Sequence, residues 1–134
     1  MGRGLAYGDF DRDGDLDLLM TTNNGAAVLF RSDQMSGNRS IRLRLTGTKS
    51  NRDAIGASVR IYHGKTRQSR MVRSGSSYLS QSELPLTFGL GKYDRVDRLV
   101  IEWPSGKSEE YKDLTAGRAY RCVEGKGILA LNGF

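Results

Sequence analysis

The sequence predicts an all-β fold, which is an antiparallel β-sandwich or a distorted barrel preceded by a short β-hairpin. Several short segments alternate apolar and polar residues with a period of two, the pattern of strands buried on one face. Turn-forming residues separate these segments, and the chain has 17 glycines but only two prolines. Its 134 residues are enough for one core of ordinary size and too few for two independent globular domains.

The first unit is predicted to contain a β-hairpin. Residues 16–21 and 26–30 are short apolar segments, and Thr22-Asn23-Asn24-Gly25 lies between them. Asn-Gly between two apolar segments is a strong hairpin signal. Residues 31–39 are polar and connect this hairpin to the rest of the chain, so we divide the protein into residues 1–35 and 36–134.

The second unit contains eight segments with strand character. Ile41, Leu43 and Leu45 alternate with Arg42 and Arg44, which predicts a strand with one face in the core and one in water. The turn His63-Gly64-Lys65 is expected to join two neighbouring strands into a hairpin. The predicted strands are residues 40–46, 57–62, 66–73, 86–90, 99–103, 109–112, 119–123 and 128–131.

An acidic loop precedes the first hairpin. Aspartate occupies every odd position from 9 to 17, and Gly14 stands at the sixth position of this segment. Carboxylates this close together repel one another, and a hard divalent cation with oxygen ligands neutralises them. We therefore predict a Ca²⁺ site in which side chains ligate from four positions and a backbone carbonyl from the fifth. The side chains are those of Asp9, Asp11, Asp13 and Asp17, and the carbonyl is that of Asp15.

Two other interpretations of a metal loop fit less well. An EF-hand needs flanking helices and a glutamate at the twelfth loop position, where this chain has Met20. Magnesium usually keeps several waters and takes one or two carboxylates, so five aspartates favour calcium. An acidic surface turn without a metal stays open as the alternative.

Charge is distributed unevenly along the chain. The net charge is +6, but residues 1–33 carry three arginines against six aspartates. Residues 34–134 carry 18 basic and nine acidic residues, with the basic ones spread along alternating strands. Phosphate binding needs a focused patch, so we expect no nucleic-acid partner. No apolar run approaches the length of a bilayer span, so we expect no membrane insertion.

Two parts of the chain resemble known families. The acidic loop, preceded by Tyr7-Gly8, is similar to the calcium loop of FG-GAP/VCBS repeats. Residues 47–57, 74–81, 88–91 and 96–106 resemble the ASPIC/UnbV domain of cartilage acidic protein-like chains. The resemblance implies a C-terminal fragment of an extracellular or cell-envelope protein, in which the first unit belongs to a propeller-type repeat. Met1 is then expected to stand where a longer chain was cut.

The sequence favours a non-catalytic role. His63 is expected in an exposed turn and the single Cys122 in a strand, and neither has an evident catalytic partner. The resemblance implies that the chain is a calcium-stabilised adhesion or ligand-binding module. A purely architectural terminal domain, or part of an enzyme whose site is shared with missing upstream blades, remains an alternative.

Candidate ligand-binding residues lie in two polar loops. Tyr78 and Gln81 belong to the segment 73–83, and Asn51 and Arg52 to the turn after the first long strand. Such loops recognise ligands in many proteins, and here we expect a carbohydrate or a protein. The alternative is that segment 73–83 only caps the sandwich. Unpaired strand edges in the first unit also make an edge-strand homodimer possible.

Overall fold

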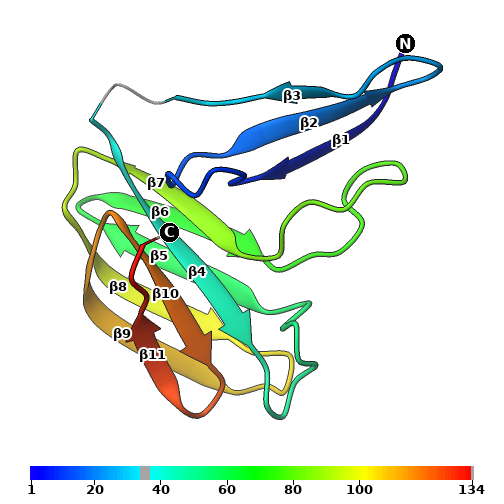
Figure 1. Ribbon diagram of the computed structural model, residues 1–134. Helices are drawn as coiled ribbons and strands as arrows, with labels where there is room; N and C mark the ends of the chain where they lie inside the picture. Colours follow the sequence, from blue (N-terminus) through cyan, green and yellow to red (C-terminus); the bar gives the residue numbers. More distant parts are fainter. Residues whose placement is uncertain (34–36, 134) are drawn as a thin grey trace.

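The computed structural model describes residues 1–33 and 37–133, which form three β-sheets and contain no helix (Figure 1). No described segment is therefore a helix long and apolar enough to cross a bilayer. The strands are β1 (Gly2–Gly8), β2 (Asp17–Thr22), β3 (Val28–Phe30), β4 (Arg39–Thr46), β5 (Ser58–His63), β6 (Thr66–Met71), β7 (Leu86–Gly91), β8 (Arg95–Glu102), β9 (Ser108–Thr115), β10 (Arg118–Val123) and β11 (Gly127–Ala130).

The N-terminal sheet has the order β1-β2-β3 and is antiparallel. Leu18 lies opposite Phe30, so the predicted hairpin of the first unit is confirmed. Strand β1 is an addition to the prediction, because three of its seven residues are glycines, which sequence propensity disfavours in strands. The acidic loop joins β1 to β2, so its two ends are held by adjacent strands.

The remaining strands form an open sandwich, which confirms the predicted fold class. One sheet has the order β11-β10-β4-β7 and the other β6-β5-β8-β9, and neither closes into a barrel. The predicted hairpin of β5 and β6 is present, with His63 opposite Thr66. Strands β4 and β10 run parallel, whereas the other described pairs are antiparallel. A parallel pair needs a long crossover, here the whole stretch between the two strands, and periodicity within one strand cannot reveal it.

The sandwich core lies between the two four-stranded sheets. Alternation along β4 buries Ile41, Leu43 and Leu45 and turns Arg44 to solvent, as predicted. The expectation that Arg42 also faces water is wrong, because its side chain is only 13% exposed and pairs with carboxylates of the N-terminal unit and the β6–β7 loop. The facing sheet contributes Val59, Ile61, Leu99 and Ile101, all fully buried. At about 25 cal/mol per Å² of apolar surface, this burial is the main favourable term in the folding of the domain.

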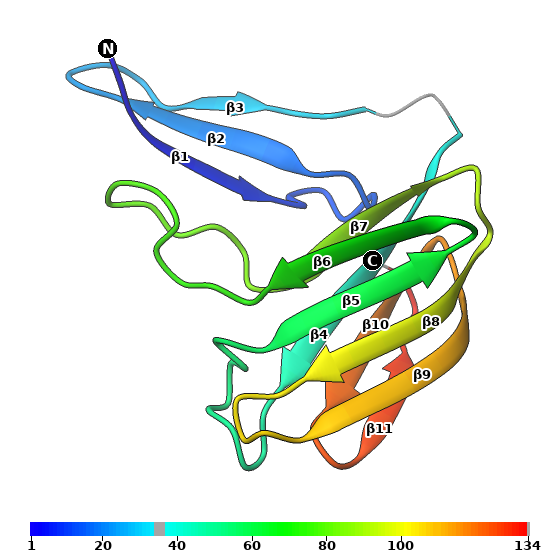
Figure 2. The same cartoon turned by 180° about the vertical axis from the view of Figure 1, so that it is seen from behind.

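The N-terminal sheet contacts the loop between β6 and β7, which lies beneath β1 in both Figure 1 and Figure 2. The backbone N–H of Glu83 donates to the carbonyl of Tyr7 at 3.1 Å. The N–H of Tyr7 donates in turn to Ser82 Oγ at 3.2 Å. The predicted division between residues 35 and 36 falls outside the described residues and stays a prediction.

Candidate metal centre

The acidic loop turns tightly between β1 and β2. Arg12 and Gly14 have left-handed backbone angles, with φ of 62° and 96°. The glycine adopts this conformation without steric cost. The N–H of Gly14 donates to Asp9 Oδ2 at 3.3 Å, and the N–H of Asp15 donates to Asp13 Oδ1 at 2.9 Å. These bonds fold the loop back on its own first carboxylate.

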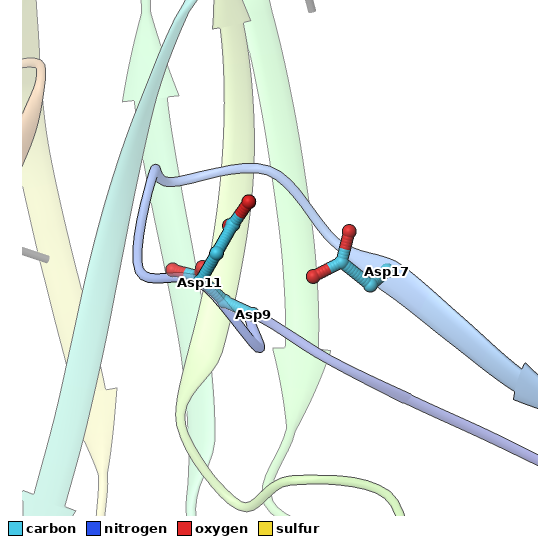
Figure 3. Close-up of side chains that lie close together, drawn as sticks. All are labelled: Asp9, Asp11 and Asp17. Atoms are coloured by element: carbon cyan, nitrogen blue, oxygen red, sulfur yellow. The ribbon is translucent and has the colours of Figure 1, made fainter. Parts of the chain in front are cut away.

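Three of the four carboxylates predicted as side-chain ligands converge on one point. One ligand oxygen from each of Asp9, Asp11 and Asp17 lies within 4.8 Å of the others. Figure 3 shows the three side chains between the end of β1 and the start of β2. Asp9 and Asp17 are buried, whereas Asp11 is exposed. The Oδ1 atom of Asp9 is buried and has no hydrogen-bond partner in the described structure. A buried, unpartnered carboxylate oxygen is costly unless a cation meets it.

Asp17 is held in place by the backbone. The N–H of Ser32 donates to Asp17 Oδ1 and the N–H of Phe10 to Asp17 Oδ2, both at 2.9 Å. These hydrogen bonds, led by the one from Ser32, hold the pKa of Asp17 below its usual value because they favour the ionised carboxylate. The carboxylate therefore stays charged and fixed at the mouth of the loop.

Two residues of the sandwich support Asp9 from outside the loop. Arg42 Nη1 of β4 lies 3.2 Å from Asp9 Oδ2, and its Nη2 donates to Glu83 Oε2. The same Glu83 oxygen accepts the N–H of Asp9 at 3.2 Å. Arg42 thus occupies Oδ2 of Asp9, and Oδ1 is left for another partner. Nothing in the local sequence pattern around Asp9 indicates this arrangement.

The other predicted ligands are arranged differently. Asp13 does not join the buried group. Its carboxylate lies instead within 4.8 Å of those of Asp11 and Asp33 in an exposed cluster. Arg31 forms an ion pair with Asp33 at 2.8 Å and approaches Asp11 at 3.9 Å. Asp15 lies in neither acidic group. The loop therefore offers one partly buried set of oxygens, the donor type that calcium prefers.

The predicted ligand-binding residues fall into two separate loops. Asn51 accepts the N–H of Ile55 at 2.9 Å and donates to its carbonyl at 2.8 Å, so its side chain closes its own turn. Gln81 likewise accepts the N–H of Gly75 and donates to the carbonyl of Ser82. Arg52 and Tyr78 are exposed. No described contact brings one pair of residues to the other.

The structure corrects the expectation that His63 is exposed. His63 ends β5 with its side chain buried, 3.0 Å from Gln68 Nε2 and edge-on to the ring of Tyr93. Its position before Gly64 suggested a turn, but the alternation along β5 continues to it and turns it inward. Cys122 is also buried, and burial followed by the charge of Glu109 raises the pKa of its thiol to about 12. A thiol with this pKa is a poor nucleophile at neutral pH.

Sequence reasoning missed a second buried carboxylate, that of Glu124. Its Oε2 accepts the backbone N–H groups of Thr48, Lys49 and Ser50, each at 2.8 Å. Its Oε1 accepts from Ser50 Oγ and from Ser105 Oγ. Burial alone would raise the pKa of Glu124, but these hydrogen bonds, led by the one from Ser105, lower it to about 2. Glu124 therefore anchors the turn at residues 48–50.

Comparisons with known proteins find relatives for most of the chain. A family model described as ASPIC and UnbV matches residues 47–129, more than half of the chain. Cartilage acidic protein 1 of Xenopus tropicalis is 37% identical over 110 residues, which cover 79% of this chain and 17% of that protein. The Homo sapiens protein is 36% identical over 110 residues, covering 79% of this chain and 16% of its own. The chain spans about a sixth of the length of these curated relatives.

Proposed function

Because the chain belongs to the ASPIC and UnbV family, we propose that it is a calcium-binding, non-catalytic adhesion or ligand-binding module of a longer extracellular protein. One observation carries the calcium assignment. The carboxylates of Asp9, Asp11 and Asp17 meet within 4.8 Å, and one buried oxygen of Asp9 has no hydrogen-bond partner in the described structure. A hard cation satisfies that oxygen and relieves the repulsion among the three charges.

Calcium would have a structural role in this loop. Asp9, Asp11 and Asp17 would hold it through their side chains, and the carboxylate of Asp13 and the carbonyl of Asp15 are the further ligands proposed. Asp9 follows the end of β1 and Asp17 begins β2. A shared cation ties the two strands together and stabilises the folded state by mass action, since the unfolded chain has no such site.

We assign the N-terminal sheet to a partial FG-GAP blade, and two observations support this proposal. Its three strands are antiparallel, and its large apolar side chains are exposed rather than packed in the sandwich core. These side chains are Leu5, Tyr7, Leu18, Leu19, Val28, Leu29 and Phe30. Exposed apolar patches of this kind mark surfaces that another element covers. In a longer parent protein, neighbouring repeats would cover them.

The relatives support the cellular location and the absence of catalysis. They are named cartilage acidic protein 1, a name that refers to an extracellular tissue and states no reaction. The candidate nucleophile Cys122 is buried with a raised pKa, which weighs in the same direction. A carbohydrate or protein ligand is therefore proposed in preference to a substrate.

Calcium titration by calorimetry, with thermal unfolding alongside, tests this function. The variant Asp11→Asn removes one exposed ligand charge without changing side-chain size. Asp53→Asn makes the same change at an exposed position outside the loop. We expect saturable binding that raises the Tm in the wild type and in the Asp53 variant, and weakening by about tenfold or more in the Asp11 variant. Equal affinity in both variants would contradict the site.

A purely architectural role is the second candidate, and the contacts between the two units favour it. The hydrogen bonds between Tyr7 and residues 82–83 fix the N-terminal sheet on the sandwich. If this is the whole function, pull-downs with glycan and protein libraries should retain nothing specific. A homodimer through the edge strand β3 is also proposed, and light scattering as a function of concentration tests it.

A further inference from the structure

A hollow of about 450 Å³ lies where β1, β6 and the loop between β6 and β7 meet. Tyr7 of β1 forms one wall, and Ser69 and Arg70 of β6 form another. Arg73 and Ser76 close it from the loop. Strands β6 and β7 are the edges of the two sandwich sheets, so the hollow occupies the open side of the sandwich. It is distinct from the acidic loop and contains none of its aspartates.

Arg70 lies on the core-facing side of its sheet, at the exposed edge. It lies opposite Val59 in the β5–β6 register, and Val59 is fully buried, so the two side chains share one side of the sheet. The Cζ atom of Arg70 lies 5.5 Å from the centre of the Phe88 ring. This cation–π contact holds the guanidinium where it lines the hollow. Its N–H groups meet no carboxylate among the described residues.

The positive charge in this region is not neutralised. Lys65, Arg67, Arg70 and Arg73 follow one another without an acidic residue before Glu83. Neither Arg70 nor Arg73 forms an ion pair in the part of the chain that the structure describes. Glu83 also lines the hollow. Its Oε2 atom pairs with Arg42, whereas its buried Oε1 atom has no hydrogen-bond partner among the described residues.

Protection of an edge strand does not explain both arginines. Charged residues on an edge strand deter pairing with other chains, and Arg67 fits that role. Arg73 lies beyond the end of β6, and Arg70 lies on the core-facing side. Two unpaired guanidinium groups beside serine hydroxyls are instead suited to an anion with further hydroxyl groups.

We propose that this hollow binds an acidic saccharide, with Arg70 and Arg73 holding its anionic group. The assignment rests on the proposed binding role of the chain and names the ligand class. Ser76 would bond a sugar hydroxyl, and the ring of Tyr7 offers an apolar wall. Arg70 also lines a neighbouring hollow of about 310 Å³ with Arg39, but Asp15 of the acidic loop lines that hollow too, so we place the anionic group in the first hollow.

An acidic peptide fits this place less well. A peptide added as a strand needs a free backbone edge. On β7 the carbonyl of Gly89 already accepts the side-chain N–H of Gln68 of β6, at 2.7 Å. This hydrogen bond links the edge strands β6 and β7 of the two sandwich sheets near the middle of each strand. A compact ligand fits beside it, whereas an extended strand would have to break it.

Calorimetry with a defined tetrasaccharide tests the proposal. The first probe is a tetrasaccharide of alternating glucuronate and N-acetylglucosamine. A sulfated form of it shows whether the site prefers a sulfate or a carboxylate. An uncharged N-acetylglucosamine tetramer is the neutral control. The variants are Arg70→Gln, Arg73→Gln and the double variant. Arg121→Gln makes the same charge change at an exposed position of β10 outside the hollow.

We expect the wild type and the Arg121 variant to bind one or both acidic probes and not the neutral one. The double variant should bind at least about tenfold more weakly, since charge-assisted hydrogen bonds are the strong ones. The proposal fails if the neutral tetramer binds equally, if the double variant binds as the wild type does, or if a glutamate hexapeptide binds more tightly than both sugars. The calcium affinity of the same variants should be unchanged. If no saccharide binds, the calcium site is therefore not contradicted. If the wild type binds no calcium, the calcium site is contradicted and the saccharide proposal is not.

Discussion

Arg42 Nη1 lies 3.2 Å from Oδ2 of Asp9, so a residue of the sandwich neutralises the first carboxylate of the acidic loop. The Asp9 side chain is fully buried and that of Arg42 is 13% exposed. Arg42 also bonds Glu83, whose carboxylate accepts the N–H of Asp9. The loop and the sandwich are therefore joined by one ionic network, and the loop geometry depends on residues of both units.

Replacing Arg42 by glutamine should destabilise the protein strongly. The change leaves the buried carboxylates of Asp9 and Glu83 without their cation, and breaking a buried ion pair typically costs about 3–5 kcal/mol. Urea unfolding measures this loss. Adding calcium should recover part of it, because the metal supplies positive charge at the same carboxylate.

The matched control for Arg42 is Arg44→Gln, on the same strand. Arg44 is exposed and forms no ion pair in the described part of the chain. Its replacement should change the free energy of unfolding by less than about 0.5 kcal/mol. Similar losses in the two variants would show that the network contributes little.

Replacing Glu124 by glutamine should loosen the turn at residues 48–50. Glutamine keeps the size of the side chain but exchanges one acceptor oxygen for an amide that donates. Three backbone N–H groups and two hydroxyls then lose their charged acceptor. We expect the Tm to fall by roughly 5 °C or more. Glu110→Gln, an exposed change on β9, is the control and should leave the Tm nearly unchanged.

Glu124 should also make the protein sensitive to acid. Its pKa is about 2 in the folded state against an ordinary value of 4.5. A lowered folded pKa contributes stability that is fully present above the unfolded value and is lost as pH falls through the folded one. The free energy of unfolding should therefore decrease from about pH 5 to about pH 2. The decrease should be smaller in Glu124→Gln, and an identical pH profile in the two proteins would contradict the assignment.

Local pattern predicted most of the strands but not the contacts that support the loop. Alternation along residues 40–46 is a property of neighbouring residues, and β4 is where it was expected. Strand β1 was missed because its glycines hide any alternation. The partners of Asp9 outside the loop are 33 and 74 residues away, and those of Glu124 are 19 and 74 to 76 residues away. Such pairs depend on strand order, which includes a parallel crossover that no single segment reveals.

Gly47 should tolerate no side chain. A Cβ atom there would lie 2.1 Å from the backbone carbonyl oxygen of Asn51, which cannot move without opening the turn that holds Glu124. Gly47→Ala should therefore destabilise the protein by about 1–3 kcal/mol, the usual cost of overpacking.

Gly89→Ala makes the same change on β7, where a Cβ atom would meet nothing within 4 Å. That variant should be neutral or more stable by about 0.5–1 kcal/mol, because alanine loses less backbone entropy on folding. Urea unfolding of the two variants measures the difference directly. If Gly47→Ala is as stable as Gly89→Ala, the close approach of Gly47 to Asn51 does not constrain the turn, and Glu124 must hold it through its hydrogen bonds alone.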